Sequence, residues 1–144
     1  MLFGQPFRSF TVPLVRLIAF RSEYQITVEP NRNRIFYKHF AELAHAWELP
    51  EYLHDWQQAL DAMRPGFTIL SDMTELAGRL GPLAELFGQV QQMLDGRGLR
   101  MIATVYASGH NLHEDSTPER PRRVFTDLWE ADKFLDELAA EPSV

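Results

Sequence analysis

The strongest fold signal in this sequence is Phe67-Thr-Ile-Leu-Ser-Asp-Met-Thr-Glu-Leu-Ala-Gly-Arg-Leu-Gly81. Residues 67–71 form a short, mainly apolar run, as expected of a strand that is covered on both faces. Asp72 follows this strand, a short loop comes next, and Pro82 is suited to the first turn of a helix. In α/β domains, a loop between the carboxyl end of a parallel strand and a helix is where ligands and phosphorylated side chains are placed. The stretch therefore predicts an α/β domain with a candidate site in this loop.

Upstream of this stretch the sequence predicts a hairpin and a helix. Residues 24–29 alternate between apolar and polar side chains, which is the period of a half-buried strand. Residues 30–33 have the composition of a turn, and the alternation resumes over residues 34–40. Apolar residues then recur at helical spacing over residues 50–63. We therefore expect two paired strands followed by an amphipathic helix.

Downstream, helices and strands continue to alternate. A helical stripe covers residues 82–94, a strand is predicted over residues 100–106 and another over residues 123–126. Asp127 is placed to cap a final helix, with Glu130 three residues on. Strands that are separated by helices must lie parallel. The predicted fold class is α/β, with a mixed, mostly parallel sheet of about four to five strands and covering helices.

The composition is that of an ordinary globular domain. The chain has 144 residues, of which 45% are hydrophobic and 24% charged, enough for one domain with one core. The absence of cysteine excludes disulfides and thiolate metal sites. The net charge of -6 argues against a nucleic-acid partner. We expect a cytoplasmic protein.

Residues 1–22 are predicted to form an apolar N-terminal arm, and residues 23–140 a single domain. Arg16 interrupts the arm, and Pro6 and Pro13 break its helical continuity. The apolar run also falls short of the roughly 20 residues that a bilayer span requires, so no transmembrane segment is predicted. Apolar side chains at this density indicate packing on the body or on a second copy, and we expect a homodimer that forms through the arm.

The region from residue 24 to residue 138 resembles a known family, the SpoIIAA-like proteins of bacteria, also called STAS or STAS/SEC14-like domains. The resemblance rests on the opening hairpin and on three stretches: Thr68-Ile-Leu-Ser-Asp-Met-Thr-Glu-Leu-Ala-Gly78, Gly98-Leu-Arg-Met-Ile-Ala-Thr-Val-Tyr-Ala-Ser108 and Val124-Phe-Thr-Asp-Leu-Trp-Glu-Ala-Asp-Lys-Phe-Leu135. It implies a small domain without catalytic activity or cofactor that regulates other proteins through contacts.

The resemblance also implies a phosphorylatable serine at the start of the second helix, where added charge meets the helix dipole. In this sequence that position falls near Leu80-Gly81, and glycine replaces the serine. The phosphorylation switch of the family is therefore not expected here. Ser71 and Thr74 remain as nearby hydroxyls, and Thr74 is better explained as a loop cap.

Our leading hypothesis is a protein-interaction or regulatory domain that lacks the phosphoacceptor of the family. Its partner surface would be the loop after the central strand together with the following helix. The residues expected to form this surface are Asp72, Thr74, Glu75, Arg79, Gly81 and Glu85.

The alternative hypothesis is a carrier of a small molecule or lipid, as in SEC14-like proteins. It is motivated by Trp47, Trp56, Phe87 and Tyr106, which could lie over a hydrophobic ligand beneath the helices at 50–63 and 82–95. Core packing explains most aromatic residues at helical spacing. The hypothesis therefore requires a pocket in which a few polar groups converge.

A hydrolase or a metal-binding protein is the third hypothesis. His110 and His113 lie within six residues of two carboxylates, but their spacing matches no zinc signature, so a surface loop is the preferred interpretation. The hydroxyl residues lack the sequence of a nucleophile elbow. We therefore predict no catalytic residue and no metal site.

Overall fold

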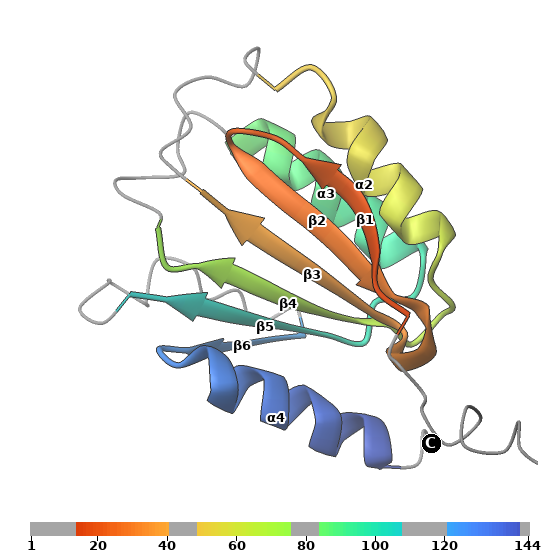
Figure 1. Cartoon of the computed structure of the whole chain (residues 1–144). Coiled ribbons are helices and arrows are strands. Elements are labelled where there is room, and N and C mark those ends of the chain that lie inside the picture. Colours follow the sequence, from red (N-terminus) through yellow and green to blue (C-terminus); the bar gives the residue numbers. More distant parts are fainter. Residues whose placement is uncertain (1–13, 41–48, 76–83, 108–120, 142–144) are drawn as a thin grey trace, which may run out of the picture.

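The computed structural model describes residues 14–40, 49–75, 84–107 and 121–141. Within these ranges it contains six strands, three α-helices and one 3-10 turn (Figure 1). In chain order they are β1 (Arg16–Phe20), β2 (Tyr24–Glu29), η1 (Pro30–Arg32), β3 (Arg34–His39), α2 (Tyr52–Asp61), β4 (Thr68–Met73), α3 (Ala84–Gly96), β5 (Met101–Tyr106), β6 (Arg122–Phe125) and α4 (Leu128–Ala140). The predicted α/β class is confirmed.

The strands form one sheet in the order β1-β2-β3-β4-β5-β6, so each strand lies beside the one that precedes it in the chain. β1, β2 and β3 pair antiparallel, whereas β3 through β6 pair parallel. The parallel pairs are those whose connections contain the helices or the long segment after β5, as expected because a parallel neighbour needs a crossover.

The sheet has six strands, and the predicted number of four to five is wrong. The additional strand is β1, which lies in the stretch that we assigned to the N-terminal arm. β1 is an edge strand whose register with β2 shifts between Leu17 and Ala19. This irregularity breaks the alternation that marks a half-buried strand. Leu17 and Phe20 are more than half exposed.

Helices cover both faces of the sheet. Figure 1 shows α2 and α3 on one face and α4 on the other. The larger core lies under α2 and α3, and its fully buried side chains include Tyr24, Ile26, Ile35, Leu60, Phe67 and Ile69. The smaller core lies under α4 and consists of Leu70, Ala103, Val105, Ala131 and Leu135. β4 and β5 contribute to both cores, which explains their nearly continuous apolar sequences.

Two ion-pair networks attach the helices to the hairpin. On the α2 side, Asp55 accepts hydrogen bonds from the Arg21 guanidinium at 2.6 and 3.0 Å and from the Tyr24 hydroxyl at 2.5 Å. On the α4 side, Arg34 contacts Asp132 at 3.0 Å and Asp136 at 2.9 Å.

The α4 network also includes the turn of the hairpin. Arg32 contacts the same two carboxylates, Asp132 at 3.0 Å and Asp136 at 2.6 Å. Asp127 caps the helix, as predicted, by accepting a hydrogen bond from the Trp129 backbone N–H at 3.0 Å. Within the described ranges, no helix combines the length and the apolar character needed to cross a bilayer.

Candidate functional site

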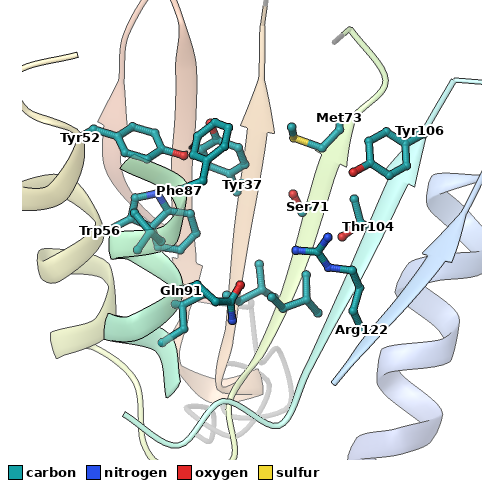
Figure 2. Close-up of a pocket in the computed structure, with 14 residues that line it drawn as sticks. Tyr37, Tyr52, Trp56, Ser71, Met73, Phe87, Gln91, Thr104, Tyr106 and Arg122 are labelled. Atoms are coloured by element: carbon teal, nitrogen blue, oxygen red, sulfur yellow. Dashed lines mark hydrogen bonds between the residues drawn. The ribbon is translucent and has the colours of Figure 1, made fainter. Parts of the chain in front are cut away.

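A cavity of about 140 Å³ lies between the sheet and the helices α2 and α3 (Figure 2). All of its lining residues come from the face of the sheet that carries the larger core and from the two helices above it. They are Tyr37, Tyr52, Trp56, Ile69, Ser71, Met73, Phe87, Val90, Gln91, Leu94, Ile102, Thr104, Tyr106 and Arg122. The cavity therefore lies beneath the two helices under which the alternative hypothesis placed a ligand.

The register of the parallel strands determines which side chains meet in the cavity. Tyr37 on β3 pairs with Ser71 on β4, which pairs with Thr104 on β5. One rung toward the amino ends of the strands, Ile102 pairs with Arg122 on β6. Side chains on neighbouring rungs of the same face are two residues apart along each strand. Four different strands thus deliver polar groups to one floor.

One end of the cavity is aromatic. The ring centroids of Tyr37 and Trp56 are 5.4 Å apart, and those of Tyr52 and Phe87 are 5.8 Å apart. The Tyr52 hydroxyl donates a hydrogen bond of 3.1 Å to the Tyr37 hydroxyl oxygen. Burial raises the pKa of Tyr52 to about 12, and burial also raises the pKa of Tyr37. Both phenols are therefore neutral at physiological pH.

Trp56 leaves a polar atom unsatisfied at this aromatic end. Its side chain is buried, and its indole Nε1 has no hydrogen-bond partner of acceptable geometry. Interaction with the indole lowers the pKa of the Tyr52 phenol, although the two groups do not have the geometry of a full hydrogen bond. A buried donor without an acceptor costs about 1–3 kcal/mol. An acceptor atom of a bound molecule could remove this cost.

The other end of the cavity is polar. Figure 2 shows the Ser71 and Thr104 hydroxyls on the floor, the Arg122 guanidinium beside them and the Tyr106 hydroxyl pointing toward the same region. The Gln91 side chain enters from α3. Arg122 is the one charged residue in the described lining. Apolar walls with a few convergent polar groups are the usual composition of a small-molecule site.

The predicted partner surface is brought together in part. Asp72 Oδ1 accepts hydrogen bonds from the Thr74 backbone N–H at 3.0 Å and from the Thr74 hydroxyl at 2.7 Å, so the capping side chain of this loop is that of Asp72, and Thr74 is its donor. Lys38 contacts Asp72 at 3.3 Å and Glu75 at 3.5 Å. Burial would raise the pKa of Asp72, but the bonds from Thr74 and Lys38 outweigh this effect and lower it. These contacts explain Asp72 as a structural residue at the end of β4.

The remaining predicted site residues either lie away from Asp72 or fall outside the described residues. Glu85 is exposed in the first turn of α3. Arg79, Gly81, His110 and His113 lie outside the described residues, as does Trp47. Within the described ranges, no group of three or more histidine, aspartate or glutamate side chains is arranged to hold a metal ion.

Sequence reasoning missed most of the polar residues of the cavity, which are Tyr37, Tyr52, Gln91, Thr104 and Arg122. It named Trp56, Phe87 and Tyr106 for a hydrophobic ligand, and all three line the cavity. A hydroxyl inside an otherwise apolar strand was an available signal, because Ser71 and Thr104 interrupt the two most buried strands. No comparable signal marked Arg122, since its neighbour Arg123 has the same side chain on the opposite face of the strand.

Comparison of the chain with family models, with curated proteins and with solved structures finds no match.

Proposed function

We propose that this protein is a binding domain for a small, largely apolar molecule that lies in the cavity beneath α2 and α3. The observation that supports it best is the composition of the lining. Aromatic side chains form one end of the cavity, and hydroxyl, amide and guanidinium groups form the other. This is the arrangement that the alternative hypothesis required.

The size of the cavity restricts the ligand. A cavity of about 150 Å³ in another protein accommodates benzene, so the 140 Å³ found here corresponds to about one six-membered ring. A long acyl chain is larger than this volume. The proposal therefore favours a compact metabolite over the lipid that was the other form of the alternative hypothesis.

The indole groups provide a direct test. In a ¹⁵N-correlated NMR titration of the full chain with benzoate, benzamide, phenol and cyclohexanol, the Trp56 Nε1–H signal should shift saturably with at least one compound. For ligands of this size we expect dissociation constants between about 1 μM and 1 mM. The Trp129 indole, whose residue is 71% exposed on α4, serves as the internal control and should not move.

A cavity-filling variant makes the test specific. Val90→Phe places a ring in the cavity from α3 and should abolish the Trp56 shift while circular dichroism remains that of the folded chain. If this substitution prevents folding, Leu94→Phe fills the same space from the next turn. A wild-type Trp56 signal that none of the four compounds moves would overturn the proposal.

The protein-interaction role implied by the family resemblance stays a prediction, as does the absence of catalytic activity. Of its six surface residues, Asp72, Thr74 and Glu75 lie together, while two lie outside the described ranges. The predicted homodimer also stays a prediction. Its contact region would include β1, whose exposed apolar side chains are Leu17 and Phe20.

A further inference from the structure

From the hydrogen-bonding groups on the floor of the cavity, we infer that its ligand is a small cyclic alcohol or phenol, and that the ligand hydroxyl lies between Ser71 and Thr104. This inference rests on the proposed function and specifies the chemical class of the ligand. It depends on two protein hydroxyls that lack partners, on the excess of acceptors around them and on the charge of the described lining.

The Ser71 and Thr104 hydroxyls are the groups that would hold the ligand. The two residues are paired across β4 and β5, so their side chains leave the same face of the sheet side by side, and both line the cavity (Figure 2). Thr104 is only 3% exposed. Within the described ranges, neither hydroxyl forms a hydrogen bond with another group of the protein. A buried hydroxyl without a partner is unfavourable, so a ligand that supplies the partner gains affinity.

The balance of donors and acceptors favours a ligand hydroxyl. Each protein hydroxyl donates one hydrogen bond and can accept two. The Gln91 amide nitrogen is used by Asp95 at 3.4 Å, and the Gln91 amide oxygen adds a further acceptor. Acceptor sites therefore outnumber donors on this part of the floor. A ligand hydroxyl can donate to one side chain and accept from another, whereas a carbonyl or ether oxygen can only accept.

Two other polar residues of the lining are left out of this balance. Tyr106 and Arg122 each already interact with another group of the protein. Their side chains are therefore not counted among the groups that a ligand must satisfy.

The charge of the lining excludes the other common type of donor. A protonated amine also donates hydrogen bonds, but none of the described lining residues is acidic. The Tyr37 and Tyr52 phenols do not supply a negative charge either, because burial raises the pKa of both. A buried cation without a counter-charge is costly. A neutral hydroxyl is the donor that fits, and the aromatic end of the cavity takes the ring that carries it.

A matched pair of probes tests this inference separately from the proposed function. Cyclohexanol and cyclohexanone have nearly the same size, and only the alcohol can donate a hydrogen bond. In isothermal titration of the full chain at neutral pH, cyclohexanol should bind roughly fivefold more tightly or better, because the ketone leaves buried acceptors unmet. Equal affinities, or tighter binding of the ketone, would overturn the alcohol inference and leave the proposed function standing.

The remaining outcomes of the titration also separate the two proposals. If neither probe binds but benzoate or benzamide shifts the Trp56 indole, the alcohol inference is wrong and the cavity is still a binding site. If no compound binds and the indole does not shift, the result counts against both.

Two threonine-to-valine variants locate the effect. Thr104→Val removes one hydroxyl at nearly constant volume, and the preference for cyclohexanol should fall to within about twofold. Thr27→Val makes the same change on β2, at a half-buried residue outside the lining of the cavity, and should leave the preference unchanged. A preference that survives in Thr104→Val would overturn the role of the Thr104 hydroxyl.

The stability of the free protein gives a second readout. Because the Thr104 hydroxyl has no partner in the protein, Thr104→Val should unfold at the wild-type temperature or above it. A decrease of more than about 3 °C would show that the hydroxyl is already satisfied without a ligand and would overturn the inference. Ser71→Ala removes the other hydroxyl and should lower the preference for cyclohexanol in the same way. An unchanged preference in Ser71→Ala would contradict a ligand hydroxyl that lies between the two residues.

Discussion

Asp55 is a buried charged residue for which a single substitution should measurably lower the stability of the protein. Its carboxylate is buried and joins α2 to the start of the hairpin through Arg21 and Tyr24. Asp55→Asn should lower the free energy of unfolding by about 2 kcal/mol, because the charge that attracts Arg21 is lost and one of the two accepting oxygens is replaced by an amide NH2 that faces hydrogen-bond donors. Urea denaturation at neutral pH measures this change.

The control for Asp55 lies on the same helix. Asp61 is 62% exposed at its side chain, and its contact is with Arg97, which is 40% exposed. Surface pairs contribute little, so Asp61→Asn should change stability by less than about 0.5 kcal/mol. Equal effects of the two substitutions would show that the buried network does not stabilise α2.

Asp72 illustrates how a predicted functional residue can be tested as a structural one. Asp72→Asn keeps an oxygen that can accept both bonds from Thr74 and loses the attraction to Lys38. Asp72→Ala loses both. We expect a loss of about 0.5 kcal/mol for the first variant and 1–2 kcal/mol for the second, from thermal or chemical unfolding. An asparagine variant as unstable as the alanine variant would instead assign the stabilisation to the charge.

At the scale of the elements, Arg34 contributes to the attachment of α4 beside the apolar contacts of the smaller core. The guanidinium is 2% exposed at its side chain, and it bonds to the Thr68 hydroxyl at 3.1 Å as well as to Asp132 and Asp136. Arg34→Met should therefore increase hydrogen exchange of the α4 amides selectively and leave α2 protected. The stability loss should be about 1–2 kcal/mol, since the carboxylates are partly solvated.

Arg32→Gln is the matched control for α4, because Arg32 contacts the same carboxylates but is 32% exposed at its side chain. Its effect on exchange should be smaller. If both substitutions leave the exchange of α4 unchanged, the smaller core alone holds the helix on the sheet.

The elements that were predictable from sequence are those with a regular period or a local cap. Apolar and polar residues alternate along β2 and β3, and α2 has a single apolar stripe. Asp127 marks the start of α4 as its N-terminal cap. β1 was not predictable because its register shift removes the period and its side chains are mostly exposed. Apolar and polar residues alternate regularly where one face of an element is buried and the other is exposed. An irregular edge strand buries little of either face, so its sequence lacks this alternation.

At the scale of the whole molecule, the buried carboxylates make stability depend on pH. Burial opposes ionisation of Asp55 and Asp136, but bonds from arginine outweigh it and hold the pKa of each below the ordinary value of 3.8. Asp72 behaves in the same way. The stabilisation from these groups is complete above the unfolded-state pKa and is lost as the pH falls through the lower folded-state values.

The contribution of these three groups to the free energy of unfolding should therefore be nearly constant from about pH 7 to pH 5. It should decrease as the pH is lowered from about 4. The Asp55→Asn variant should show a shallower fall, because one of the three groups no longer titrates. Urea denaturation between pH 2.5 and pH 7 measures both slopes. Parallel curves for variant and wild type would show that the Asp55 pKa is the same in both states.

The cavity is formed by residues from four strands and two helices that are far apart in the sequence, so the sequence predicted it only in part. Sequence patterns identified the helices that form its roof and several of its aromatic residues. The polar floor depends on Tyr37, Ser71 and Thr104 standing side by side, and this follows from a parallel register that no local pattern specifies. Arg122 joins them from a fourth strand, β6.

The sequential order of the strands also determines how the chain can fold as it is synthesised. In the parallel part of the sheet, paired residues such as Arg34 and Thr68 are 34 positions apart, so each strand can dock on its predecessor soon after it leaves the ribosome. The contact between Arg32 and Asp136 spans 104 positions. Arg32 can pair with Glu29 as soon as the hairpin has formed, but its bonds to Asp132 and Asp136 form only after α4 has been synthesised.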